Sequence, residues 1–254
     1  MQAQYESGAG QPRELSGGQA SALAQERQLG PILSQEIDGV SVKSTADRVV
    51  DWIVEQIRSR RLVAGQRLVE SALAKEFGVG TVPVREALRT LAGDGVVEIT
   101  PNRGARIRVM SAKQIADMLK AMMGLFFVAL DELENDPGRV KRIIPDLQEV
   151  CAKLEKLNNK EDKFEILESM QEYMFIIIQA SENSYIMDRV RKFHLDYYNQ
   201  QVLRFVSIRH IRENGLDHFK LTQALESLDF KRARRLLRAS RDRAILDLED
   251  RETA

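Results

Sequence analysis

One short stretch constrains the fold of this chain more than any other, because its apolar residues predict two helices separated by very few residues. Within residues 73–91, Leu73 and Phe77 stand four positions apart, which places both side chains on one face of a first helix. The same helical spacing resumes a few residues later, at Val84, Leu88 and Leu91. Two helices this close in sequence are typical of a helix-turn-helix.

The residues between the two predicted helices suit a tight turn. Gly78 stands where a helix C-terminus favours a left-handed residue, which glycine adopts without steric cost. Thr81 is predicted to cap the second helix, and Pro83 is tolerated in its first turn because the N–H that proline lacks would be unpaired there. Arg85 and Arg89 lie one turn apart on this helix, which in such a motif can enter the DNA major groove.

A β-hairpin is predicted directly after this motif. Residues 96–100 and 105–109 are two short apolar-rich runs on either side of the turn sequence Pro101-Asn102-Arg103-Gly104. Alternation in the second run directs Ile107 and Val109 inward. A hairpin in this position is a wing, and the arginine at its tip, Arg103, can reach the minor groove or phosphates of DNA. The alternative is a solvated turn residue.

The formal charge of the chain is zero, but the charge is unevenly spread. Residues 44–110 carry eleven Lys and Arg against eight Asp and Glu, whereas residues 1–43 and 111–254 are each net negative. The positive segment is the one with the helix-turn-helix, which weakly supports binding to a polyanion. A single cysteine excludes an intrachain disulfide, and no apolar run reaches membrane-spanning length. Without a signal-peptide pattern either, we expect a cytoplasmic protein with no membrane contact.

The sequence divides into three parts of different character. Residues 1–43 are rich in Gln, Gly, Ser and Ala and are expected to form a flexible tail before the winged helix-turn-helix at 44–110. Residues 111–254 show only helical patterns, beginning with a capping-box pair at Ser111 and Gln114. About six helices are predicted there, at roughly 111–134, 138–158, 161–181, 184–205, 207–228 and 230–250. The fold class is therefore mainly α, a winged helix-turn-helix followed by an all-helical bundle.

A longer motif runs through the first half of the chain, as Leu68-Val69-Glu70, Leu73-Ala74, Phe77-Gly78-Val79, Pro83-Val84-Arg85-Glu86-Ala87-Leu88, Leu91, Asp94-Gly95 and Pro101-Asn102-Arg103-Gly104. Further matching residues follow in the second half, at Ala180-Ser181-Glu182-Asn183, His218, Leu221, Ala224, Leu225 and Asp229. With these residues the chain resembles the GntR superfamily of bacterial transcription regulators. The similarity is to its FadR-like branch, which has an all-helical FCD ligand-binding domain, and it covers residues 44–245.

The resemblance implies a homodimer that reads double-stranded operator DNA with its winged helix and binds a small-molecule effector in its C-terminal domain. Arg85 and Arg89 match positions on the recognition helix, and Arg85 is the strongest candidate for a contact to phosphate or guanine. Thr81 stands where the family usually has Arg, so a common DNA contact is missing, although threonine can bond a phosphate or touch a thymine methyl. Ser71 and Lys75 are candidate contacts to the DNA backbone, or plain surface residues.

The metal site of many FCD domains is not expected in this chain. Those domains hold a divalent metal with an Asp and a His one turn apart and two later histidines, at positions that correspond to Met170, Met174, His218 and Ser240. One imidazole and two thioethers would hold Zn²⁺, Ni²⁺ or Mn²⁺ poorly, because these ions prefer harder ligands. The sequence therefore predicts no metal and no other cofactor.

The same part of the chain predicts an apolar, deformable effector pocket. Met122 and Phe126 stand where the family often has an arginine and a glutamate near its ligand. With Met170 and Met174 they favour an effector with a large apolar part, acyl or aromatic. The polar groups that would orient it are Tyr173, His218 and Ser240. Ordinary packing of a helical core explains the same apolar residues equally well.

The sequence contains no catalytic constellation such as a phosphate-binding glycine loop or an HExxH motif, so an enzyme is not expected. The interpretation is an effector-responsive homodimer on a pseudo-palindromic operator, because two-fold dimers read two-fold sites. The rival is a winged-helix protein-interaction module without direct DNA readout. The missing arginine at Thr81 slightly favours the rival, whereas Arg85, Arg89 and Arg103 oppose it.

Overall fold

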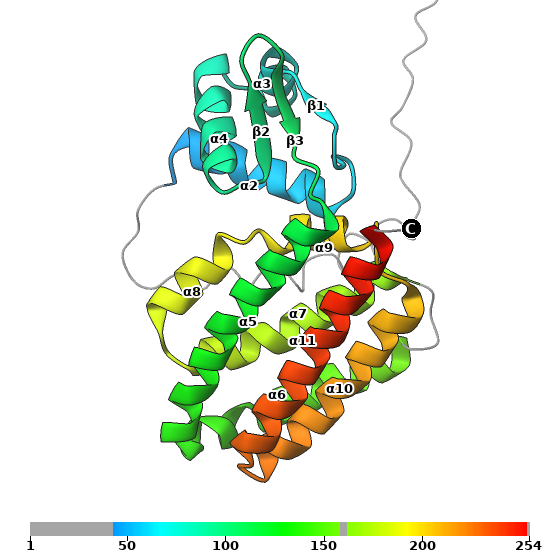
Figure 1. Cartoon of the computed structure of the whole chain (residues 1–254). Coiled ribbons are helices and arrows are strands. Elements are labelled where there is room, and N and C mark those ends of the chain that lie inside the picture. The colour runs from blue at the N-terminus through cyan, green and yellow to red at the C-terminus, as the bar shows by residue number, and fades with distance from the viewer. Residues whose placement is uncertain (1–42, 158–161, 253–254) are drawn as a thin grey trace, which may run out of the picture. The chain divides into compact units, whose positions relative to one another are not determined.

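The computed structural model describes residues 43–157 and 162–252 (Figure 1). The predicted tail at 1–43 lies outside the described residues except for Lys43, whose ammonium lies 2.9 Å from the Asp51 carboxylate. The winged part consists of α2 (Thr45–Arg58), β1 (Arg67–Leu68), α3 (Glu70–Phe77), α4 (Thr81–Gly93), β2 (Val97–Thr100) and β3 (Gly104–Ile107). Its antiparallel sheet has the order β1-β3-β2, with Leu68 opposite Ala105 and Val97 opposite Ile107.

The turn between α3 and α4 forms as predicted, with one exception. Gly78 ends α3 in the left-handed conformation, at φ +76°, and Pro83 lies in the first turn of α4. The prediction that Thr81 caps α4 is wrong, because Gly80 has the extended backbone of the N-cap residue and Thr81 is already helical. A side chain caps a helix from the position just before it, so Thr81 presents its hydroxyl on the outer surface instead.

One hydrophobic core joins the helices of the winged part to its sheet. Val84, Leu88 and Leu91 of α4 are buried there, as their spacing predicts, together with Ile107 of β3. The inward orientation predicted for Val109 is wrong: its side chain is 44% exposed. The alternation of inward and outward side chains ends with β3 at Ile107, so it does not reach Val109.

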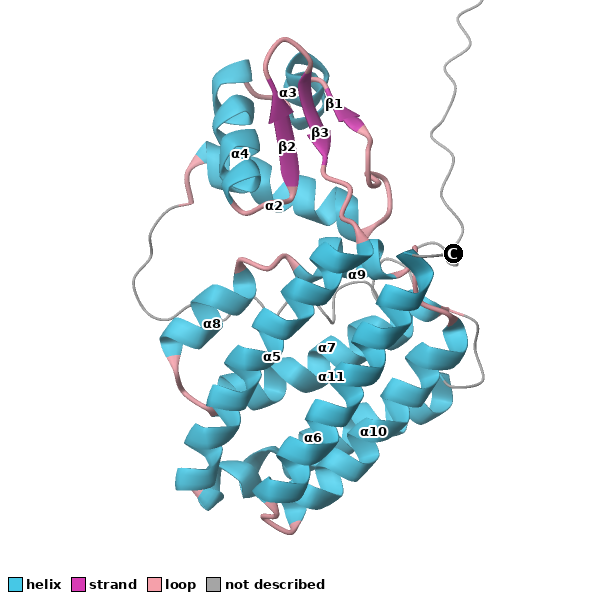
Figure 2. Cartoon of the chain, viewed as in Figure 1, coloured by secondary structure: helices cyan, strands magenta, loops and turns pink. Residues whose placement is uncertain are grey.

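Every regular element after β3 is a helix in the part of the chain that the structure describes (Figure 2). The elements are α5 (Ala112–Asn135), α6 (Pro137–Leu157), α7 (Lys163–Ala180), α8 (Ser184–Arg191), α9 (Leu195–Val202), α10 (Ile208–Glu226) and α11 (Phe230–Glu252). The predicted capping box starts α5, since the side chains of Ser111 and Gln114 each bond the other residue's backbone N–H. This confirms the mainly helical fold class, with a winged helix-turn-helix ahead of a helical region.

The single helix predicted at 184–205 is wrong, because the chain changes direction in its middle. α8 ends at Arg191, His194 adopts a left-handed conformation with φ 46°, and α9 begins at Leu195. No glycine or proline marks this change, so the helical sequence pattern runs straight through it. Residues 112–252 therefore hold seven described helices, where six were predicted.

The long helices of this region pack around a shared interior. α5 contacts α11, α7 and α6, while α10 contacts α6, α7 and α11 (Figure 1). Phe126, Leu130 and Leu133 of α5 are fully buried in this interior. None of the described helices combines the length and the apolar content that crossing a membrane requires.

Candidate functional site

The outer face of α4 is a candidate DNA-reading surface. Thr81, Arg85 and Arg89 are all exposed on it, because the apolar residues between them occupy the opposite, buried face. Val82 also belongs to this face and is 63% exposed, although its apolar side chain was not singled out from the sequence. Two cations, a hydroxyl and an apolar group near the helix N-terminus are suited to phosphates, base edges and thymine methyls.

Arg85 is held in place by a residue of the preceding helix. Its Nε donates to Oε2 of Glu70 at 3.0 Å, and its terminal nitrogen donates to the same oxygen at 2.8 Å. This hydrogen bond raises the pKa of the Arg85 guanidinium, so the group stays charged. The pair fixes the guanidinium on the outer surface between α3 and α4, where α3 also exposes Ser71 and Lys75. The sequence motif includes Glu70, but only the fold reveals this contact.

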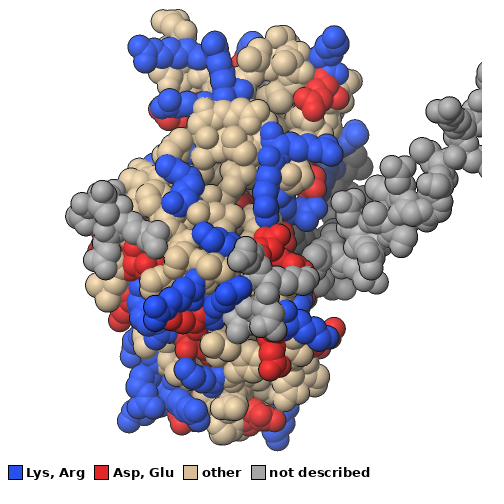
Figure 3. Space-filling view, turned by 90° about the vertical axis from the view of Figure 1, so that its right-hand side faces the viewer, with Lys and Arg blue, Asp and Glu red and all other residues tan. Residues whose placement is uncertain are grey.

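The wing presents its arginine in a tight turn. The Arg103 backbone N–H donates to the carbonyl of Thr100 at 3.0 Å, and the left-handed backbones of Asn102 and Gly104 flank it, at φ +62° and +81°. The Arg103 side chain is exposed. Figure 3 shows basic side chains standing out on the winged part, with fewer acidic ones beside them in that view. The predicted DNA-contacting residues thus all lie on the surface of the winged part.

The helical region contains a mostly apolar cavity of about 160 Å³ that is partly open to solvent. Five of the seven residues predicted for an effector pocket lie in its wall, namely Met122, Met170, Met174, His218 and Ser240. Further lining residues come from five helices and include Leu119, Met123, Gln171, Tyr198, Asn199, Val202, Asn214, Leu237 and Arg241. A cavity of ~150 Å³ is large enough for a molecule such as benzene, so this one has the size of a small-ligand site.

Phe126 and Tyr173, the other two predicted pocket residues, lie outside the cavity wall. Phe126 is fully buried in the core beneath α5. Tyr173 is also fully buried, with its hydroxyl 2.9 Å from Oγ1 of Thr222 and its ring edge-on to the imidazole of His218. Both side chains fill the core beside the cavity: Phe126 lies one helical turn beyond the wall residue Met122, and Tyr173 packs against the wall residue His218.

His218 is a buried and neutral wall residue. Its Nδ1 donates to the backbone carbonyl of Asn214 at 3.0 Å, which leaves Nε2 of the neutral ring as a hydrogen-bond acceptor. Burial lowers the pKa of His218 from 6.5 to about 4, because the surroundings disfavour the charged imidazolium. At neutral pH this part of the cavity therefore carries no positive charge.

The cavity wall does not fit the metal that the FCD resemblance implies. Met170, Met174, His218 and Ser240 do line one space, as the resemblance implies for the metal ligands, but they supply only one imidazole and no carboxylate. Within the described residues, no group of three or more His, Cys, Asp or Glu side chains could hold an ion. His194 and His210 lie elsewhere, each 3.0 Å or less from a carboxylate, of Asp94 and Asp247 respectively.

The burial of His218 gives a pH-dependent stability. The folded state disfavours proton binding to this ring. The contribution of the neutral ring to the free energy of unfolding is therefore complete above pH 6.5 and is lost as the pH falls toward 4. The loss should reach roughly 3 kcal/mol of unfolding free energy. Urea unfolding at pH 7 and pH 4 should therefore show a smaller pH dependence for His218→Asn, whose amide nitrogen can replace Nδ1. An equal pH dependence in both proteins would contradict this explanation.

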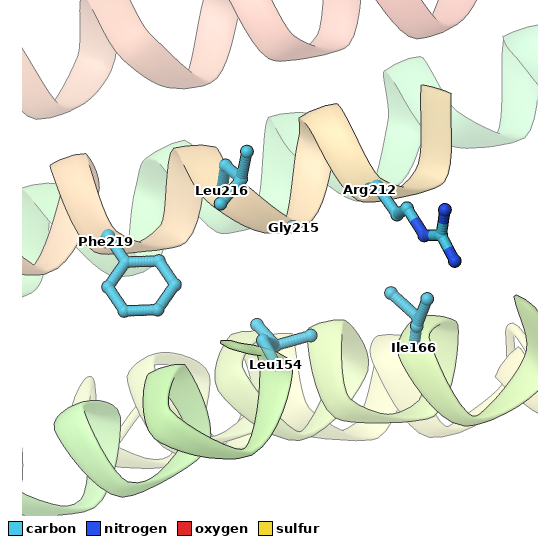
Figure 4. Close-up of a pocket in the computed structure, with 6 residues that line it drawn as sticks. All are labelled: Leu154, Ile166, Arg212, Gly215, Leu216 and Phe219. Carbon is cyan, nitrogen blue, oxygen red and sulfur yellow. The ribbon is translucent and has the colours of Figure 1, made fainter. Parts of the chain in front are cut away.

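A second hollow is too small for a ligand. Figure 4 shows it between Leu154 and Ile166 on one side and residues of α10, including Gly215 and Phe219, on the other. Its volume is about 10 Å³, which is close to the space of a single water molecule. The larger cavity therefore remains the candidate ligand site.

Helix α9 joins the cavity wall to the winged part. Tyr198, Asn199 and Val202 of α9 line the cavity. From the same helix, Gln200 donates to the carbonyls of Ile57 and Leu62, at 3.1 and 2.8 Å, at the end of α2 and just beyond it.

Other residues in and around α9 bond the winged part as well. The Tyr197 hydroxyl donates to the carbonyl of Arg108 at 3.0 Å, and Gln201 accepts from the backbone N–H of Met110 at 3.1 Å. His194, just before α9, lies 2.9 Å from Asp94, the residue that follows α4. These links join residues about a hundred positions apart in the sequence, and no sequence pattern indicated them.

Comparison with known proteins finds relatives among bacterial transcription regulators. The family described as bacterial regulatory proteins, gntR family, matches residues 45–107. The gluconate operon transcriptional repressor of Bacillus subtilis is 30% identical over 152 residues, which are 58% of this chain and 59% of the repressor. The transcriptional repressor GlaR of Escherichia coli is 24% identical over 202 residues, 74% of this chain and 88% of GlaR.

Among solved structures, a transcriptional regulator from Rhodococcus sp. RHA1 has the same fold, with a TM-score of 0.67 at 18% identity over 82% of this chain and 99% of that chain. The match covers 54%, 38% and 60% of the length of three further curated relatives. These relatives are regulators and not enzymes, as expected for a chain without a catalytic motif.

Proposed function

We propose that this chain is a GntR-family regulator with an N-terminal winged helix-turn-helix, which binds a pseudo-palindromic DNA operator as a homodimer and responds to a small molecule. In this proposal residues 44–110 read DNA. Residues 111–254 form an FCD domain of the FadR-like branch, which binds the effector and dimerises. A regulator of bacterial DNA works in the cytoplasm.

The observation that carries the DNA-binding proposal is the exposed face of α4. Arg85 and Arg89 stand one turn apart on it, and Glu70 holds Arg85 in an orientation that needs little further ordering on binding. Ser71 and Lys75 on α3 are suited to the phosphate backbone, and Arg103 at the wing tip to the neighbouring minor groove. Together these side chains supply both positioning and base contacts.

Thr81 and Val82 are the proposed source of operator preference. Both are exposed at the first turn of α4, the part of a recognition helix that contacts base edges. A threonine methyl and a valine side chain favour thymine methyl groups over the guanine that an arginine would select. The operator should therefore be richer in A·T pairs at this position than one read by a relative with arginine there.

The cavity in the helical region is the proposed effector site, and it works without a metal. Its wall of methionine and aliphatic side chains favours a ligand with an apolar body. Helix α9 is the proposed link to DNA binding, since one side of it lines the cavity and the other bonds the end of α2 and the strand exit at Arg108. A ligand that shifts α9 changes the orientation or mobility of the winged part, and this changes the affinity of the protein for DNA.

Selection of bound duplexes from a random-sequence DNA library tests the DNA-binding proposal, because such a library contains every candidate half-site. We expect inverted repeats, with half-site centres one helical turn or a multiple apart, and two chains per duplex by light scattering. A variant with Thr81→Arg provides a matched control, because it should shift the selected sequences toward guanine. Absence of any enriched sequence would reject this proposal and favour the protein-interaction module.

A further inference from the structure

Asn199 is an unusual residue in the wall of the cavity. It is 2% exposed, and its Nδ2 has no hydrogen-bond partner among the described residues. Two other polar side chains of the wall are bonded: Gln171 donates to the carbonyl of Leu195, and Ser240 donates to Oδ1 of Asn214. A buried amide donor without a partner destabilises the empty protein, and a ligand that accepts its hydrogen bond removes that cost.

The charges around the cavity favour an uncharged ligand. Arg241 is the only Lys, Arg, Asp or Glu among the described wall residues, and the Asp242 carboxylate already lies 2.7 Å from its guanidinium. His218 is neutral, so Arg241, already paired with Asp242, is the one cation that the described wall offers to a carboxylate or phosphate. An anion placed away from Arg241 would lose its hydration without an ionic partner, which opposes its binding.

The volume and the apolar wall set the size of the ligand. About 160 Å³ is close to the ~150 Å³ of a cavity known to hold benzene, and Met122, Met170 and Met174 can adjust to an irregular shape. A body of one ring or a short branched chain fills this space. A long acyl chain exceeds this volume and would have to extend out of the cavity, so the cavity favours the smaller members of the effector class expected from the sequence.

We propose that Asn199 donates its amide N–H to an uncharged oxygen of a small, mostly apolar effector, such as the carbonyl of a one-ring ketone. The proposal rests on the cavity being the effector site, and it adds the residue that selects the ligand. It also places the polar contact on α9, the helix that bonds the winged part through Gln200. A ligand anchored at Asn199 therefore acts directly on α9, the helix that contacts the winged part.

Two probes that differ only in the proposed acceptor provide the test. Acetophenone carries a carbonyl oxygen where α-methylstyrene, of the same shape, carries a CH₂ group. Ligand-observed NMR titration gives the dissociation constant of each for the full-length protein and for Asn199→Leu, which keeps the size of the side chain. The ratio of the two constants should shift by about tenfold toward α-methylstyrene in the variant, the worth of one buried hydrogen bond.

Two controls keep the result interpretable. Asn135→Leu removes an exposed amide at the end of α5, away from the cavity wall, and should leave the ratio unchanged. Asn199→Leu should unfold at the same or a higher temperature, because it removes a buried donor without a partner; if it fails to fold, Asn199→Ala replaces it. An unchanged ratio in the folded variant overturns the role of Asn199. Failure of both probes to bind the wild-type protein overturns the cavity as the effector site, while DNA selection still tests the reader.

Discussion

Replacement of Arg85 by alanine should weaken operator binding by roughly 10- to 100-fold, the effect expected when a bidentate arginine contact is lost. Arg85 is a cation on the exposed face of α4, and Glu70 accepts two hydrogen bonds from its guanidinium. A mobility-shift titration on a selected operator at several salt concentrations measures the loss. If the contact is to a phosphate, the dependence of log affinity on log salt should become less steep by about one.

Arg142→Ala is the matched control for this result. Arg142 is an exposed arginine near the start of α6, and like Arg85 it pairs with a glutamate, Glu182. The substitution removes the same charge from the protein but lies outside the proposed reader, so operator affinity should change little. Equal affinities of wild type and Arg85→Ala, or equal losses in the two variants, would contradict the assignment of α4 as the recognition helix.

Phe126→Ala should lower the free energy of unfolding by about 3–5 kcal/mol, the usual cost of removing a fully buried phenylalanine. Its ring is completely inaccessible and lies outside the cavity wall, so the substitution creates a new void in the core. Urea unfolding measures the loss. Acetophenone binding under folding conditions should remain close to that of the wild-type protein, because no wall residue is removed.

Met122→Ala, one turn earlier on α5, separates a core residue from a wall residue. Met122 is partly exposed and borders the cavity, so it loses fewer packing contacts and should destabilise the fold less than Phe126→Ala does. It should instead change the affinity for acetophenone. The assignments would be reversed if Met122→Ala cost more stability and Phe126→Ala had the larger effect on ligand binding.

Local sequence signals were sufficient to predict most of the winged part. The apolar spacing of Leu88 and Leu91, the left-handed glycine Gly78 and the hairpin turn depend on contacts within a few residues, and all three formed as predicted. The errors occurred where one element ends and another begins. Thr81 fell inside α4 rather than before it, and Val109 fell beyond the end of β3, because the bond pattern that ends an element involves residues outside it.

The methionines predicted for the effector pocket line the cavity, but not every predicted pocket residue does. Met122, Met170 and Met174 line the cavity, whereas Phe126 and Tyr173 pack beside it. Helical periodicity indicates which residues face the interior of a bundle, but it does not distinguish a side chain that fills the interior from one that borders an empty space. That distinction depends on how neighbouring helices are offset, which is a property of the packing.

The sequence by itself determined the class of protein, because a helix-turn-helix, a wing and a series of amphipathic helices are each encoded by neighbouring residues. Only the tertiary structure decided how the cavity is connected to the winged part. The chain direction changes at His194 without a glycine or proline, and α9 then brings Asn199 to the cavity wall and Gln200 to the end of α2. Such contacts join residues far apart in the chain, so they exist only once the helices have packed.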